Sequence, residues 1–77
     1  MTQLPRASGK AVVQALERGG FTVSHRRGSH VYLRKLGVAA LVIVPVHGNR
    51  DLPAGTLRSI VRQSGLSVDE LVELLKR

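Results

Sequence analysis

The chain has 77 residues, enough for one small domain, and we expect residues 1–77 to form a single unit. It contains no cysteine, which excludes disulfides, thiolate catalysis and cysteine-based zinc sites. Twelve Lys and Arg residues against five Asp and Glu residues give a formal net charge of +7, which favours a polyanionic partner such as nucleic acid. No apolar segment reaches the roughly 20 residues of a membrane-spanning helix, and no secretory signal is visible, so we expect a cytoplasmic protein that does not enter membranes.

The first predicted helix follows Ser8, a residue type that often caps helix N-termini, and ends at a pair of glycines. Residues 21–26 then alternate apolar and polar side chains, which predicts a half-buried strand. In that alternation His25 falls on the apolar side, so we interpret it as a structural residue. A turn is expected at residues 27–28, where a glycine follows two arginines.

A second strand is predicted from His30, because burial of Val31 and Leu33 would place every other side chain on the opposite face. That face would carry His30, Tyr32 and Arg34 together. A turn at residues 35–37 would then reverse the chain.

The third predicted strand covers residues 38–44, and Pro45 should end it or place it at a sheet edge. Residues 38–46 are apolar at nearly every position, so one side of this strand would stay exposed unless a partner protein or a second copy of the chain covers it. This pattern predicts a protein partner and leaves a homo-oligomer open.

Two further helices are expected near the C-terminus. Pro53 suits the start of the first, since it lacks the amide proton that a first-turn residue leaves unpaired. Ser67 and Glu70 form a capping box at the start of the second. The predicted fold class is therefore α+β, with a helix, a three-stranded antiparallel sheet and two helices packed on one sheet face.

The segment Gly28-Ser29-His30 places a histidine at the start of a strand, next to arginine side chains. Metal-independent RNA cleavage needs a base for the 2′-hydroxyl proton, an acid for the leaving oxygen and cations near the phosphate. An imidazole can serve in either proton-transfer role near neutral pH, and an ordinary surface histidine is the alternative interpretation. His47 could reach the same end of the sheet or hold RNA. Three histidines without cysteine or close ligand spacing predict neither a metal site nor a cofactor.

The last two predicted helices have the outline of a DNA-binding helix-turn-helix. The second of them carries Asp69, Glu70 and Glu73, which would be repelled by DNA phosphates. Arg58 and Arg62 on the preceding helix are better candidates for nucleic-acid contacts, or belong to a solvated face.

Four separated segments together resemble HicA-type toxins over nearly the whole chain: Gly28-Ser29-His30-Val31, Val44-Pro45-Val46-His47-Gly48-Asn49, Gly55-Thr56-Leu57-Arg58-Ser59-Ile60 and Ser64-Gly65-Leu66-Ser67. The resemblance implies a fold similar to double-stranded-RNA-binding domains. It also implies an mRNA interferase of a toxin-antitoxin system, with His30 as the catalytic residue. A HicB-type antitoxin that occludes the active site is the implied protein partner.

The leading hypothesis is a metal-independent endoribonuclease that cleaves mRNA, with His30 as general base or acid. The alternative is a non-catalytic RNA-binding module that uses the same basic face, and a DNA-binding protein is a weaker third. We expect the phosphate and RNA contacts to include Lys10, Arg26, Arg27, Ser29, Tyr32, Arg34 and Arg58.

Overall fold

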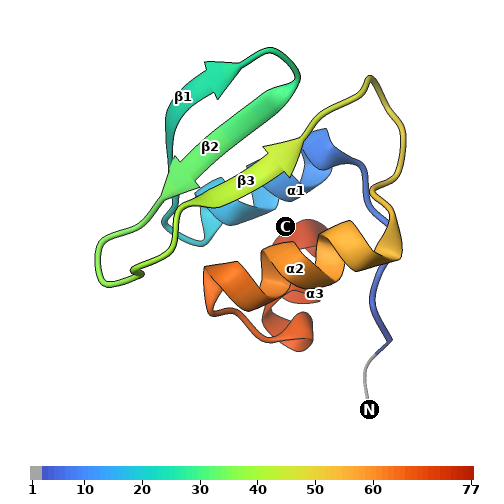
Figure 1. Ribbon diagram of the computed structural model, residues 1–77. Helices are drawn as coiled ribbons and strands as arrows, with labels where there is room; N and C mark the ends of the chain where they lie inside the picture. The colour runs from blue at the N-terminus through green and yellow to red at the C-terminus, as the bar shows by residue number, and fades with distance from the viewer. Residues whose placement is uncertain (1–2) are drawn as a thin grey trace.

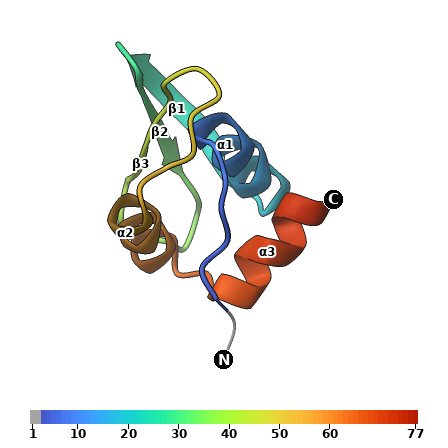
Figure 2. The ribbon, with the colours of Figure 1, turned by 90° about the vertical axis from the view of Figure 1, so that its right-hand side faces the viewer.

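A computed structural model describes residues 3–77. In chain order the elements are helix α1 (Gly9–Arg18), strands β1 (Thr22–Arg27), β2 (His30–Arg34) and β3 (Val42–Pro45), and helices α2 (Ala54–Ser64) and α3 (Val68–Lys76) (Figure 1). The strands form one antiparallel sheet in the order β1-β2-β3. This is the predicted α+β architecture, and Figure 2 shows α1 and α3 on one side of the sheet and α2 below the strands.

The core lies between the sheet and the helices. It is aliphatic apart from Phe21, and its most buried side chains come from α1, β2, β3, α2 and α3: Val12, Leu16, Leu33, Val42, Val44, Leu57, Ile60 and Leu71. Helices α1 and α2 contact the sheet, and α3 packs against α1. Burial of these side chains is the main force that holds the layers together, which leaves the other side of the sheet uncovered by helices.

The helix ends follow the predicted local signals. The Ser8 side chain accepts a hydrogen bond from the backbone N–H of Ala11 at 3.1 Å, which caps α1. Gly65 ends α2 with a left-handed φ of 75°, a conformation that glycine adopts without steric cost. Pro53 is the N-cap residue of α2, one position before the helix begins.

A capping box starts α3, as predicted. The Glu70 N–H donates to Ser67 Oγ at 3.0 Å, and the Ser67 N–H donates to Glu70 Oε1 at 2.9 Å. These bonds to the Ser67 backbone and side chain lower the pKa of Glu70 below its usual 4.5. Because folding lowers this pKa, the associated stabilisation is complete above pH 4.5 and is lost as the pH falls through the folded-state value.

The Ser67→Ala variant should be less stable than the wild type by about 1 kcal/mol at neutral pH, because the Glu70 N–H in the first turn of α3 loses its acceptor. Ser67→Asn, which keeps an acceptor at the N-cap, should retain most of the stability. Denaturant unfolding monitored by circular dichroism measures both differences. Equal losses in the two variants would contradict a capping role.

The first strand contains a bulge that changes which side of the sheet its following side chains face. Val23 pairs with Leu33, but the next pair is His25 with Tyr32, so Ser24 is an extra residue in β1. The extra residue reverses the alternation, and His25 points to the same side as Tyr32 instead of into the core. The expectation that His25 lies on the apolar side of the strand is therefore wrong: its side chain is exposed.

The third strand is shorter than predicted. It begins at Val42, and residues 35–41 form the connection from β2, with a turn closed by the Val38 N–H donating to the Lys35 carbonyl at 3.0 Å. Leu33 pairs with Val42. If the same register continued to Val38, its partner would be Gly37, which is its own neighbour in the chain, so the strand pairing cannot extend that far. The apolar run therefore supplies both a strand and a loop, and Pro45 ends the strand at the sheet edge as expected.

Candidate functional site

The side of the sheet that faces away from the helices carries the candidate chemistry. Alternation along β2 buries Val31 and Leu33 and turns the residues between and beside them outward. We call this side the open face; it comprises Thr22, His25 and Arg27 of β1, His30, Tyr32 and Arg34 of β2, and Ile43 and Pro45 of β3. This set contains two arginines and no Asp or Glu, so the face attracts anions.

His30 lies at one end of the open face, as the first residue of β2. Its cross-strand neighbours are Arg27 on β1 and Pro45 on β3, and its side chain is exposed. The turn that precedes it needs Gly28, whose φ of 59° favours a residue without a Cβ. Pairing on both sides therefore holds the backbone of His30, while its imidazole stays accessible to a substrate.

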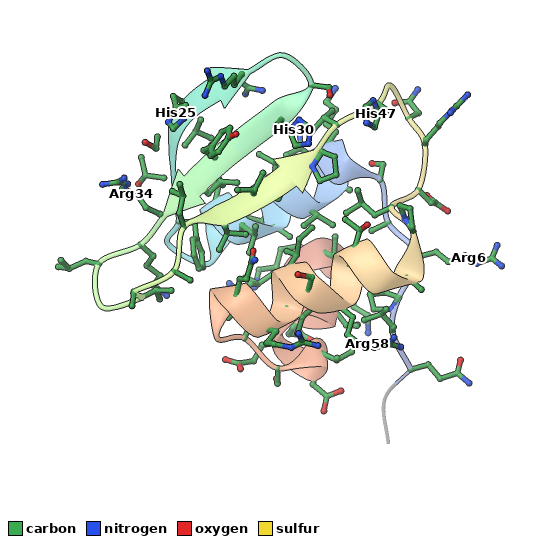
Figure 3. The ribbon with its side chains drawn as sticks, viewed as in Figure 1. Arg6, His25, His30, Arg34, His47 and Arg58 are labelled. Carbon is green, nitrogen blue, oxygen red and sulfur yellow. The ribbon has the colours of Figure 1, made fainter. Side chains whose placement is uncertain are left out.

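The same end of the sheet is held by backbone contacts. The Val46 N–H donates to the Ser29 carbonyl at 2.7 Å, which joins the end of β3 to the turn between β1 and β2. Gly9 packs so closely against this segment that a Cβ there would lie 2.1 Å from the Pro45 carbonyl oxygen. As a result, the loop that carries His47 leaves the sheet beside His30, and Figure 3 shows both histidines at this end.

His47 also lines a hollow of about 410 Å³ between this loop and the start of α2, with Arg50, Asp51 and Thr56 among the other lining residues. The loop is tied to the N-terminal segment by the Leu52 N–H, which donates to the Ala7 carbonyl at 2.8 Å. The fold therefore places His47, a second exposed histidine, near His30. The hydrogen bonds described for residues 3–77 include none between the two side chains.

The centre of the open face carries an aromatic pair that sequence reasoning missed. The rings of His25 and Tyr32 stack with their centroids 4.2 Å apart and their planes 12° from parallel. Ile43, the partner of Tyr32 on β3, is 37% exposed. The pair depends on the bulge at Ser24, which a single sequence does not reveal because a strand alternation gives no sign of one extra residue.

Several predicted RNA contacts do not lie with His30. Arg26 pairs with the inward-facing Val31, so it points to the side of the sheet opposite Arg27. There it lines a hollow of about 240 Å³ beside α1, together with Lys10 and Glu17. Arg26 and Arg27, both expected as phosphate contacts, therefore face opposite sides of the sheet, because neighbouring strand residues face opposite ways.

The remaining predicted contacts are spread over the molecule. Arg34 lies on the open face at the end of β2 opposite His30, whereas Arg58 projects from α2 on the side away from the sheet (Figure 3). Ser29 is half-buried in the β1–β2 turn. Of the predicted set, the open face thus brings together Arg27, His30, Tyr32 and Arg34.

The apolar exposure predicted for the third strand region is present but lies mostly in the loop before it. Leu36 is fully exposed, and Ala39 and Ala40 beside it are also exposed. Within residues 3–77 no group of three His, Cys, Asp or Glu side chains lies close enough to hold a metal ion. The described helices include none that is long and apolar enough to cross a membrane.

A small domain in which a helix precedes a three-stranded meander, with further helices on one face, has the double-stranded-RNA-binding-domain-like architecture. A family model described as HicA toxin of bacterial toxin-antitoxin matches residues 9–66. The match covers most of the chain, from the start of α1 to just after α2, and the chain belongs to this family of toxins from toxin-antitoxin systems. A search of curated proteins found no match.

Proposed function

We propose that this toxin is an mRNA interferase, an endoribonuclease that cuts mRNA in the cytoplasm with His30 as its catalytic residue. The observation that carries the proposal is the position of His30: an accessible imidazole on a firmly paired strand, directly opposite Arg27, on the uncovered side of a basic domain. Membership of a toxin family supports a harmful activity of this kind.

The chemistry follows from what these groups can do. The imidazole of His30 takes the proton of a ribose 2′-hydroxyl, whose oxygen attacks the adjacent phosphorus. The bond from phosphorus to the 5′-oxygen breaks, so the products are a 2′,3′-cyclic phosphate and a 5′-hydroxyl end. Arg27 stabilises the negative charge that builds on the phosphoryl oxygens. The leaving oxygen needs a proton, and the donor in this proposal is His47, whose side chain lies at the same end of the sheet (Figure 3).

We propose that a HicB-type antitoxin neutralises the toxin by covering the open face. A partner seated there would bury Ile43 and the Tyr32 ring and would block access to His30. The exposed apolar loop around Leu36 follows β2 at the end of the open face opposite His30 and would extend the contact. A second copy of the chain on this surface is the alternative, and the molecular mass of the isolated protein in solution separates the two.

The test is cleavage of RNA by the purified protein in the presence of EDTA. We expect cutting to persist in the chelator, to leave cyclic phosphate ends, and to stop at a position where the 2′-hydroxyl is replaced by hydrogen. Binding without cutting would instead identify a non-catalytic RNA-binding module. Cutting that continues at the 2′-deoxy position, or that needs a metal ion, would refute the proposed chemistry.

The Arg27→Gln variant should bind RNA more weakly than the wild type, by about threefold to tenfold, since a phosphate contact beside His30 is lost. The slope of log affinity against log salt should fall by about 1. Arg58→Gln is the matched control, because it removes the same charge from the far side of α2. Fluorescence anisotropy at several salt concentrations measures both, and equal losses would mean that only overall charge matters.

A further inference from the structure

We propose that His25 binds one unpaired RNA base by stacking, so that the base extends the ring pair of His25 and Tyr32 by one layer. The inference rests on the proposed function and names a substrate contact and a substrate class for the same site. It starts from the bulge at Ser24, which brings an exposed imidazole onto the open face at the middle of β1.

The ring faces of the pair differ in their accessibility. One face of the Tyr32 ring is covered by His25, and Ile43 is its cross-strand neighbour on the other side. His25 lies on β1, an edge strand of the sheet, and its side chain is exposed. The outer face of the imidazole is therefore the free end of the stack, where a planar ring can be added.

The imidazole is already oriented for such a contact. Its Nδ1 lies 3.1 Å from the hydroxyl oxygen of Ser24, the extra residue of the bulge. With Tyr32 parallel to it on one side, the ring has little freedom left to lose when a base stacks on the other. Such preorganisation is a common feature of residues that bind nucleobases.

The position of His25 matches a nucleotide bound next to His30. Arg27 lies two residues along β1 on the same face, a separation of about 7 Å, and it pairs with His30. A nucleotide whose base stacks on His25 can place its phosphate toward Arg27 and its ribose toward His30. The three open-face residues would thus hold base, phosphate and reacting sugar.

This arrangement selects single-stranded RNA. Inside a duplex both faces of each base are already stacked on neighbouring pairs, so no internal base is free to cover an imidazole. Stacking uses the aromatic face that all four bases share, which predicts tolerance of base identity at this position. The substrate class is therefore an unpaired stretch of RNA, not the double helix that the fold alone would suggest.

The first test measures the affinity of wild type and His25→Ala for a short single-stranded 2′-fluoro RNA, which cannot be cut by 2′-hydroxyl attack. A series of such oligonucleotides, each lacking the base at one position, removes the other partner of the proposed stack. We expect His25→Ala to weaken binding by about five- to hundredfold, and one abasic position to weaken wild-type binding similarly. In His25→Ala that abasic position should have no further effect.

A second test uses the absence of tryptophan from the chain. His25→Trp should keep its affinity within about threefold, because indole stacks at least as well as imidazole, and its fluorescence should be quenched by the single-stranded oligonucleotide. A long RNA duplex, in which nearly all bases lie between neighbouring pairs, should not quench it. Quenching by the duplex alone, or none by either RNA despite normal affinity, would overturn the inference.

The outcomes separate this inference from the proposed function. If wild type neither binds nor cuts RNA, the proposed function fails and the stacking site with it. If wild type cuts RNA and His25→Ala binds the intact oligonucleotide as tightly as the wild type does, only the stacking site is refuted. If His25→Ala binds more weakly than the wild type, and every abasic position still lowers its affinity by the same factor as in the wild type, then His25 only supports the sheet.

Discussion

Replacement of His30 with alanine is expected to reduce the rate of RNA cleavage by about 10²- to 10⁴-fold, the usual contribution of a general acid or base. The side chain is exposed and leaves no buried cavity when it is removed, so the variant should fold like the wild type. RNA binding should change little, because Arg27, Tyr32 and Arg34 of the open face are intact. Initial rates on a labelled RNA in EDTA and binding by anisotropy measure the two effects separately.

Chemical rescue provides the control for this prediction. Because the side chain of His30 is exposed, added imidazole can enter the space left in His30→Ala and should restore part of the rate. His47→Ala should also slow cleavage, because the leaving oxygen loses the proton donor proposed for it. Cleavage by His30→Ala at the wild-type rate would remove His30 from the mechanism.

Gly9→Ala is expected to destabilise the protein by about 1–3 kcal/mol, the usual cost of overpacking. A Cβ at this position would meet the Pro45 carbonyl oxygen at 2.1 Å and the Val46 Cα at 3.1 Å, and both are backbone atoms that a rotamer change cannot move away. In a domain of this size such a loss lowers Tm by roughly 4–8 °C per kcal/mol. Thermal unfolding followed by circular dichroism tests it.

Gly55→Ala is the matched control, because it makes the same change in the first turn of another helix. A Cβ at Gly55 would meet no atom within 4 Å, and alanine favours the helix by roughly 0.5–1 kcal/mol over glycine. This variant should therefore be at least as stable as the wild type.

The Gly9→Ala substitution should also slow RNA cleavage, since it displaces the segment that holds the turn before His30. Equal stability of the two variants would show that α1 can shift without cost.

Much of the fold follows from local features of the sequence. Ser8 and Ser67 cap their helices, and Gly65 ends another, because capping and glycine geometry involve residues only a few positions apart. The outward direction of His30 was also predictable, since alternation along a regular strand such as β2 needs no knowledge of its neighbours. The end of β3 at Pro45 has the same local origin.

Other features depend on contacts between distant residues. The start of β3 is set by its register with β2, which the apolar run around it does not encode. The close approach of Gly9 to Pro45 joins a helix to a strand far along the chain. The positive residues of the sequence form no single cluster, because Arg58 and Arg26 project from surfaces other than the open face.

Local sequence signals specify the caps and stops of the helices, the α+β class and the place of His30 at the start of an alternating strand, because each depends on residues that are neighbours in the chain. Which side chains join His30 depends instead on how the strands pair. The pairing of β1 with β2 introduces the bulge at Ser24, separates Arg26 from Arg27 and turns His25 onto the ring of Tyr32. A strand register is a property of two segments together, so neither segment alone could specify it.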